Sequence, residues 1–315
     1  MKKARVKRKT KKFNMDDLEL TALAMPTTIV MLLLCYLPMF GVIIAFKNFQ
    51  LAGDNFIGDL LSSPWSGLSN FKFLFATSDA WIIIRNTVCY NIVFILLGTV
   101  IEVILAMILS ELLNQFCAKL YQTMMMLPYF LSWIVVGSFV YAFLSPSTGL
   151  VNHVLQALHL GTVAWYTNTG VWPYLLTFLS VWKGFGYGTV MYLAAIAGID
   201  KSLYEASLMD GATKLQQAKY VTLPSIKTVI VILLILAVGG IFGGDFGLFY
   251  IIPRKSGELY NVTEIIDTYV YGAISGTGNI GMSSAAAFFQ SVLGCIMLIG
   301  TNFIVSKIDP DNSLF

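Results

Sequence analysis

The amino-acid sequence predicts an all-α protein that crosses a membrane six times. Three observations support this prediction: the composition, six long apolar segments, and an uneven distribution of lysine and arginine. Of the 315 residues, 57% are hydrophobic and only 12% are charged, whereas soluble domains carry roughly 25% charged residues. A soluble fold of this length would leave large apolar patches exposed. Lipid is therefore the expected solvent for much of the chain.

Six segments are long and apolar enough to cross a hydrocarbon core of roughly 30 Å. The third carries Pro128 near its predicted start, where a missing amide donor costs least. The fifth contains five glycines between Gly239 and Gly247, so we expect it to be bent or locally unwound. The six segments cover residues 22–46, 86–110, 123–145, 173–197, 227–252 and 285–306.

The basic residues predict the orientation in the membrane. Eight of the 20 lysines and arginines lie in the first 12 positions, which predicts a cytoplasmic leader at 1–20 and a transmembrane domain at 21–315. Six crossings then place both termini in the cytoplasm. The inner segments hold 14 basic residues and the outer segments five. A nucleic-acid-binding arm is the alternative, but the apolar runs that follow speak against it.

Several chemical functions find no support in the sequence. The four cysteines are scattered and the two histidines share one loop, so no disulfide framework or metal site is indicated. Residues 276–281 spell GxGxxG, but no strand precedes them and an apolar segment follows. We therefore expect no cofactor and no nucleotide site in this chain, which would not be an enzyme by itself.

Residues 199–225, between the fourth and fifth segments, predict a helical elbow on the cytoplasmic side. Ser202 precedes Glu205 by three residues, which is the spacing of a capping box. Gly211 allows the backbone to turn between two short helices. Pro224 ends the run before the next membrane segment.

The elbow also resembles the EAA signature of permease subunits in binding-protein-dependent ABC importers. Glu205-Ala206-Ser207 is followed after three residues by Gly211, and after nine more by Val221-x-Leu223-Pro224. The family form is Glu-Ala-Ala-x3-Gly-x9-Ile-x-Leu-Pro, so Ser207 and Val221 are small departures. Further stretches resemble the carbohydrate-uptake branch and its lipoprotein-dependent oligosaccharide permeases: Tyr204 to Ala212, Trp182-Lys183-Gly184, Tyr192 to Ala195, Gly281-x3-Ala285 and Thr301-Asn302.

This resemblance implies a type I ABC importer transmembrane fold in a bacterial cytoplasmic membrane. The implied partners are a second homologous permease, two ATPase subunits that bind ATP and Mg, an extracellular solute-binding lipoprotein and an oligosaccharide substrate. The elbow would be the coupling helix that sits in a cleft of the ATPase subunit. The residues implied in ATPase coupling are Glu205, Ala206, Ser207, Asp210, Gly211, Ala212, Leu223 and Pro224.

Polar residues inside the predicted segments suggest a translocation pathway, because an ionisable side chain in lipid is costly unless it faces protein or water. Lys183 would lie near the midplane and Asp245 nearer the outer leaflet. Alternatively, Lys183 bonds a carbonyl of the glycine-rich fifth segment or pairs with the second permease. Aromatic faces with hydrogen-bonding groups suit a sugar. The pathway candidates are Lys183, Tyr187, Tyr192, Asp245 and Phe246.

Other functions remain as alternatives. An ion-coupled secondary transporter could work through Glu102, Lys183 and Asp245, although such proteins commonly show internal repeats and none is visible. A membrane enzyme would need a cluster of acid, base or metal-binding residues, which the sequence does not display. An ABC permease for a solute other than a sugar is the third alternative. Dependence of uptake on ATP rather than on a proton gradient would separate the first alternative from an importer.

Overall fold

The structure is a computed structural model that describes residues 15–50, 55–72, 78–112 and 114–314. In these ranges the chain is helical, with one isolated antiparallel bridge between Lys47 and Trp65. The predicted leader at 1–20 lies outside the described residues up to position 14, and a helix already begins at Met15. The α-helices are α1 Met15–Met31, α2 Leu37–Met39, α3 Phe56–Ser62, α5 Ser78–Ser110, α6 Gln115–Phe130, α7 Trp133–Leu144, α8 Leu150–Ala157, α9 Trp172–Ala197, α10 Lys201–Met209, α11 Lys214–Gln217, α12 Leu223–Ser225, α13 Lys227–Gly239, α14 Phe246–Ile251, α15 Tyr260–Thr263, α16 Ile266–Thr277 and α17 Ile280–Ile308.

Three helices of the described chain are long and apolar enough to cross a membrane: Glu19–Phe46, Asp79–Ser110 and Ile280–Ile308. Two bent pairs, Phe116–Phe130 with Trp133–Leu144 and Lys214–Ser225 with Lys227–Gly239, raise the number to five if each pair is one span. Helix α9 has 26 residues, about 39 Å at 1.5 Å per residue, but Lys183, its glycines and its tyrosines make it more polar. The six-span topology and the cytoplasmic termini therefore stay predictions.

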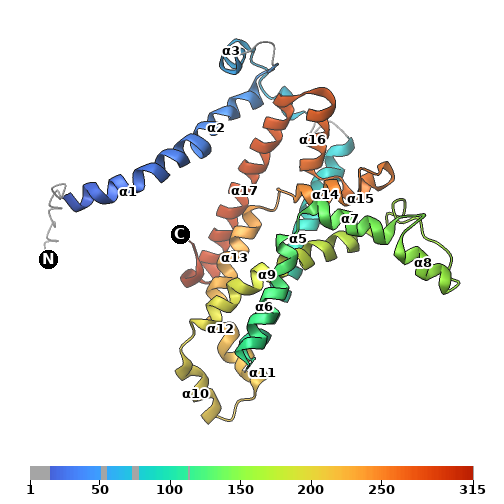
Figure 1. Cartoon of the computed structure of the whole chain (residues 1–315). Coiled ribbons are helices and arrows are strands. Elements are labelled where there is room, and N and C mark those ends of the chain that lie inside the picture. Colours follow the sequence, from blue (N-terminus) through green and yellow to red (C-terminus); the bar gives the residue numbers. More distant parts are fainter. Residues whose placement is uncertain (1–14, 51–54, 73–77, 113, 315) are drawn as a thin grey trace.

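The first membrane segment stands away from the rest of the fold. It runs through α1, a π-helical turn at Leu32–Tyr36, α2 and a 3-10 segment at Phe40–Phe46. Figure 1 shows it projecting sideways from the bundle that α5, α9, α13 and α17 form. Most of its apolar side chains are exposed in this single chain.

The third predicted segment, 123–145, is not one continuous helix, and the sequence-based expectation is corrected here. Helix α6 ends at Phe130, α7 begins at Trp133, and their axes differ by 91°. Leu131 and Ser132 are extended, and the Ser132 hydroxyl accepts a hydrogen bond from Val135 N at 3.4 Å. Pro128 lies near the end of α6 rather than near the start of a span, and its carbonyl accepts from Leu131 N at 3.2 Å. An N-cap serine after an extended residue thus starts a new helix in a new direction.

The interruption expected in the fifth segment is present. Helix α13 ends at Gly239, and the chain turns through Gly240 to Gly244 before Asp245 caps α14. The Oδ1 atom of Asp245 accepts a hydrogen bond from Leu248 N at 3.2 Å. The glycine-rich stretch is therefore an unwound link between two helices.

Close packing against α9 depends on two of its three central glycines. A Cβ atom on Gly186 would lie 1.9 Å from Met125 O, and one on Gly188 would lie 2.0 Å from Cδ of Glu102. These two glycines allow close helix packing. Gly184 has no such neighbour within 4 Å. The main core lies where α5, α7, α9 and α14 meet, around Trp172, Leu176, Leu248 and Ile252.

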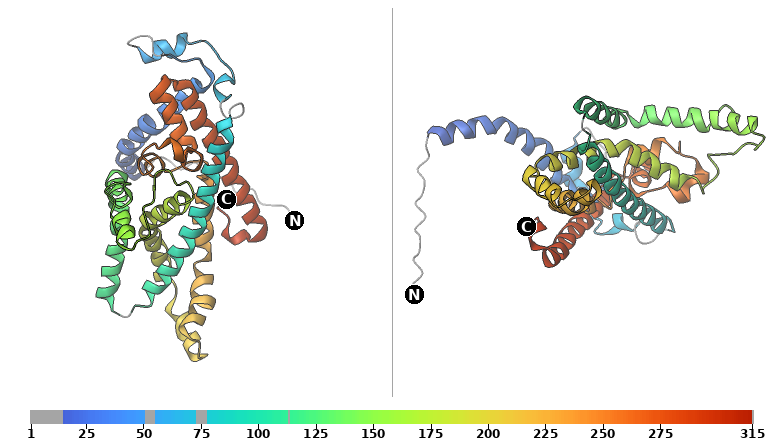
Figure 2. Two further views of the ribbon diagram at one scale, coloured as in Figure 1. Left: turned by 90° about the vertical axis from the view of Figure 1, so that its right-hand side faces the viewer. Right: turned by 90° about the horizontal axis from the view of Figure 1, so that it is seen from below.

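The two ends of the bundle are built differently. Helices α10 to α12 project from one end, where α5 and α9 also finish (Figure 1). Helices α3 and α16 lie at the opposite end, and the left view of Figure 2 also shows α10 far from them. The predicted elbow thus lies at the end of the molecule opposite to α3 and α16.

Candidate functional site

The elbow begins with α10, whose N-cap is Asp200. The Oδ1 atom of Asp200 accepts a hydrogen bond from Ser202 N at 2.9 Å, and the bonds from Ser202 lower the pKa of this exposed carboxyl below its ordinary value. The expected capping box at Ser202 and Glu205 is wrong, because Ser202 already lies inside the helix. The capping box is instead at Thr213 and Gln216, ahead of α11, where Thr213 N donates to Gln216 Oε1 at 2.7 Å.

Gly211 turns the elbow, as predicted. Its φ is +75°, in the left-handed region that glycine enters without steric cost. Gly211 N donates to Leu208 O, and Ala212 N donates to Ser207 O, both at 3.0 Å. These two bonds are those of a Schellman motif, which satisfies the last carbonyls of α10.

A chain of side-chain hydrogen bonds ties the two halves of the elbow together. Gln217, only 1% exposed, donates from Nε2 to Ser207 Oγ at 2.9 Å. Ser207 Oγ in turn donates to Tyr204 O at 2.7 Å. The hydroxyls of Tyr204 and Thr222 lie 2.9 Å apart. Because these bonds cross from α10 to the second half, the elbow can move as one rigid body.

One ion pair connects the elbow to the bundle. Lys214 Nζ lies 2.7 Å from Glu111 Oε2, just beyond the end of α5. Both side chains are substantially exposed, so the pair contributes about 0–1 kcal/mol at most. Its role is to orient α11 rather than to hold the fold.

The surface of the elbow is exposed and partly apolar. Four residues implied in ATPase coupling are exposed: Glu205, Ala206, Asp210 and Gly211. Leu223 and Pro224 are also exposed, while Ser207 and Ala212 are half-buried. Beside them Met209 is 88% and Leu215 84% exposed. Exposed apolar side chains on a rigid projecting segment such as the elbow are typical of a surface that binds another protein.

Lys183 lies at the break between α6 and α7. Its Nζ donates to Tyr129 O at 2.8 Å and lies 5.4 Å from the Tyr129 ring and 5.3 Å from the Trp133 ring. Tyr129 O is a terminal carbonyl of α6 that lacks a helical donor because the helix stops. Lys183 therefore bonds a carbonyl of the third predicted segment, not of the glycine-rich fifth, which corrects the alternative stated above.

Trp133 connects this break to Asp245. Its Nε1 donates to Asp245 Oδ2 at 2.8 Å. A Cβ atom on Gly247 would lie 2.1 Å from Cδ1 of the indole, so only glycine allows α14 to approach so closely. Through Trp133 the structure brings Lys183 and Asp245 onto one surface.

Phe246 begins an aromatic cluster that continues this surface. Its ring stacks on Tyr250, with centroids 4.7 Å apart and planes at 20°. Tyr271 of α16 meets both rings edge-on, at 4.9 Å and 5.0 Å. Lys255 Nζ lies 4.6 Å from the Tyr250 centroid and 5.8 Å from that of Tyr271. Aromatic rings with a lysine beside them can stack on a ligand ring while the lysine supplies a positive charge.

The two remaining pathway candidates differ in position. Tyr187 is exposed and stacks on Tyr129, with centroids 5.0 Å apart. Tyr192 is 2% exposed and packs in a core cluster with Val103 and Ile226. Both line a cavity of about 400 Å³ that also borders Glu102. Tyr192 is thus buried in the wall of this cavity, whereas Tyr187 is exposed.

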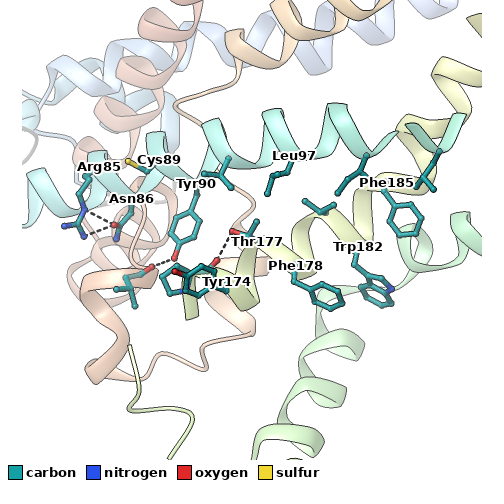
Figure 3. Close-up of a pocket in the computed structure, with 16 residues that line it drawn as sticks. Arg85, Asn86, Cys89, Tyr90, Leu97, Tyr174, Thr177, Phe178, Trp182 and Phe185 are labelled. Atoms are coloured by element: carbon teal, nitrogen blue, oxygen red, sulfur yellow. Dashed lines mark hydrogen bonds between the residues drawn. The ribbon is translucent and has the colours of Figure 1, made fainter. Parts of the chain in front are cut away.

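A larger groove of about 850 Å³ lies between α5 and α9 (Figure 3). Its walls are almost entirely apolar, with Leu97, Phe178 and Trp182 among them. The polar groups at one end are already bonded: Tyr90 Oη donates to Val262 O at 2.7 Å, and the Arg85 side chain donates to Asn86 Oδ1. Such a groove offers a sugar few hydrogen-bonding partners.

Sequence reasoning missed Tyr129, Trp133, Tyr271 and Lys255. Trp133 follows Ser132 directly, and serine is a common N-cap residue. Predicting a new helix from Ser132 would have placed Trp133 at a helix start rather than inside a continuous membrane-spanning helix. Tyr271 and Lys255 come from separate loops and helices, and no local pattern indicates that they meet.

Comparisons with known proteins agree with this arrangement. Residues 95–310 match the family described as binding-protein-dependent transport system inner membrane component. Protein LplB of Bacillus subtilis is 32% identical over 295 residues, covering 94% of this chain and 91% of that protein. The polygalacturonan/rhamnogalacturonan transport system permease protein YteP of the same organism is 33% identical, covering 90% and 86%. A chain of a bacterial alginate ABC transporter, solved with an alginate pentasaccharide-bound periplasmic protein, superposes with a TM-score of 0.80 at 29% identity, covering 93% and 96%. The chain belongs to the family of binding-protein-dependent transport system inner membrane components, the permeases of ABC importers.

Proposed function

We propose that this chain is a transmembrane permease subunit of an ATP-driven importer that moves an oligosaccharide across a bacterial cytoplasmic membrane. The observation that carries the proposal is the elbow, in which hydrogen bonds lock α10 to α11 and to the π-helical turn Ala218–Thr222, while Glu205, Asp210 and Gly211 stay exposed. A rigid projection of this kind can transmit the closure of an ATPase to the membrane helices. The carbohydrate class is supported by the relatives, whose names specify polygalacturonan/rhamnogalacturonan and alginate.

The proposal requires partners that complete the machine. A single subunit of this fold supplies one wall of a translocation pathway, so a second homologous permease would supply the other. Two ATPase subunits would bind ATP and Mg, and one of them would receive the eight coupling residues of this chain's elbow. An external solute-binding lipoprotein would deliver the oligosaccharide to the side where α3 and α16 lie.

Four of the five pathway candidates are proposed to contact the substrate. Lys183 and Tyr187 contact Tyr129, Asp245 bonds Trp133, and Phe246 follows Asp245 directly in the chain. Tyr192 is proposed to support the wall from behind, since its side chain is buried. These roles follow from position and chemistry.

Reconstitution tests the proposal directly. The chain, its second permease and the ATPases are placed in proteoliposomes, and uptake of labelled oligosaccharide is measured with the binding lipoprotein present. We expect uptake that needs ATP and that persists when a protonophore removes the proton gradient. Uptake that follows the gradient and ignores ATP would identify an ion-coupled transporter instead.

A further inference from the structure

The connection between α7 and α9 carries a short amphipathic helix, α8, whose apolar side is turned outward. Apolar residues recur in it with a helical period, at positions 150, 151, 154, 155 and 158. In a water-soluble protein the apolar face of such a helix packs against the core. Here Leu150, Val154 and Leu158 are 53%, 50% and 62% exposed. These three side chains form an apolar stripe along the outside of α8.

The polar side of α8 is instead bonded to the protein. Asn152 is only 3% exposed, and its amide group uses its full hydrogen-bonding capacity. Its Nδ2 atom donates to Pro146 O at 3.2 Å and to Val163 O at 3.0 Å. Its Oδ1 atom accepts from Val163 N at 3.1 Å and from Trp165 Nε1 at 3.0 Å. These bonds fix the rotation of α8 about its axis, so the apolar stripe faces away from the protein.

Helix α8 lies at the ends of two membrane helices, on the side away from the elbow. It follows α7 and precedes α9, and α9 reaches the elbow only at its other end. Figure 1 shows α8 projecting from the bundle on the side opposite to α1. Tyr141, in the last turn of α7, and Tyr174, in the first turn of α9, are 37% and 78% exposed. Exposed tyrosines at the ends of membrane helices are typical of the membrane–water interface.

The charge pattern favours lipid over water or a protein as the surroundings of the stripe. Residues 120–182 contain no Asp, Glu, Lys or Arg, whereas a protein interface normally has a polar rim. Exposed Phe139 and Phe143 of α7 and Phe178 of α9 line a shallow apolar cavity of about 280 Å³. The apolar surface of the membrane helices therefore continues into the α8 connection without a charged side chain.

We propose that α8 is an interfacial anchor in the leaflet opposite to the elbow, with Leu150, Val154 and Leu158 against lipid acyl chains. His153 and Gln156, which are exposed beside the stripe, face the headgroups and water. Helices of this kind bury their apolar face about 5–10 Å into the boundary between headgroups and acyl chains. Because the polar side has no lysine or arginine, the anchor depends on buried apolar area and not on attraction to anionic lipid.

The anchor has a mechanical consequence for α9. Trp172 begins α9, is 1% exposed, and donates from Nε1 to Trp165 O at 2.7 Å. The loop that Asn152 holds is thus bonded to the start of α9. The other end of α9 is Ala197, and the elbow helix α10 follows at Lys201. Lipid contact at α8 therefore holds one end of α9 while the elbow moves the other.

Fluorescent labels on the two sides of α8 test the inference. The four native cysteines are changed to alanine, and single cysteines are introduced as Val154→Cys, Leu158→Cys, His153→Cys and Gln156→Cys. Each variant, in the whole complex in proteoliposomes, is labelled with an environment-sensitive fluorophore and exposed to brominated phospholipid or to aqueous iodide. We expect brominated lipid to quench the labels at 154 and 158 at least about twofold more than those at 153 and 156, and iodide to give the reverse order.

A matched pair of added charges gives a second measurement. Val154→Glu and Gln156→Glu place the same carboxylate on the two sides of α8. Because a carboxylate is costly among acyl chains, Val154→Glu should lower the lipid quenching of the label at 158 by about twofold or more. Gln156→Glu keeps the carboxylate in water and should leave that quenching unchanged. Equal effects of the two changes would contradict the orientation of α8.

Two further outcomes would overturn the inference. Strong quenching of all four labels by iodide would show that water surrounds α8. Protection of the labels at 154 and 158 from both quenchers would show that a protein covers the stripe. Omission of the binding lipoprotein or of the second permease would then identify that protein, because the labels would become accessible in its absence.

Discussion

Gln217 donates a hydrogen bond to Ser207 across the elbow, from Nε2 to Oγ at 2.9 Å, and its side chain is almost completely buried. The bond joins the two helical halves on either side of Gly211. Ser207 is the position where the family signature has alanine, so this serine supplies an oxygen that the consensus residue lacks. The stiffness of the elbow thus depends on a contact that the signature residue Ser207 makes.

Gln217→Leu should loosen this joint. The substitution removes the donor to Ser207 Oγ, and we expect a loss of about 1 kcal/mol of stability and fewer sugars moved per ATP. The thermal midpoint of the purified complex and the transport-to-hydrolysis ratio measure both effects. Ser207→Ala combined with Gln217→Leu should cost less than the sum of the single changes. Gln156→Leu, at an exposed position on α8, is the control, and a similar loss there would show that the elbow is not special.

Gly211→Ala should weaken docking of the ATPase. Nothing lies within 4 Å of the added Cβ, so the cost comes from the φ of +75° and amounts to about 1–2 kcal/mol. Co-purification of the ATPase with the permease reports the effect, and Gly211→Asn should be milder because asparagine tolerates this region. Gly257→Ala is matched, with equally open space and no positive φ. Equal retention of the ATPase by the alanine variants at 211 and 257 would contradict the prediction.

Gly247→Ala should disturb the surface that carries Asp245. The new methyl group would lie 2.1 Å from Cδ1 of Trp133, and overpacking of this kind typically costs about 1–3 kcal/mol. We expect a lower thermal midpoint and reduced uptake. Gly272→Ala adds the same group where nothing lies within 4 Å, and its midpoint should be unchanged. A normal midpoint for Gly247→Ala would show that Trp133 can move aside freely.

Acid should selectively remove the contribution of Asp309. Hydrogen bonds from Lys227 and Asn312 hold the pKa of this carboxyl below its ordinary value. Because the folded-state pKa is lowered, the stabilisation is fully present above the unfolded pKa of about 3.9 and is lost as the pH falls through the folded value. The difference in thermal midpoint between the unmodified protein and Asp309→Asn should be constant from about pH 8 to 5 and shrink below about pH 4. If the difference in thermal midpoint between the unmodified protein and Asp309→Asn grew as the pH fell, the lowered pKa of Asp309 would be contradicted.

The sequence by itself determined the features that depend on local chemistry. Composition indicated lipid as the solvent, the apolar runs located the long helices α5, α9 and α17, and the glycines between 239 and 247 indicated the break before α14. The Gly211 turn could be predicted because the left-handed glycine that ends a helix is stabilised by hydrogen bonds to residues close to it in the sequence. The capping box was misplaced at Ser202 because Asp200, two residues earlier, is an equally good N-cap.

The tertiary structure alone decided the contacts that build the candidate pathway. Lys183 bonds the carbonyl of a residue 54 positions away, and Trp133 bonds one 112 positions away. The break between α6 and α7 leaves Tyr129 O without a helical donor and brings Trp133 against Gly247, and both consequences need α9 and α14 already in place. Periodicity reports which face of a helix is apolar, but not which distant residue satisfies a freed carbonyl. For that reason the carbonyl and the aromatic rings that surround the Lys183 ammonium group emerged only from the packing of the helices.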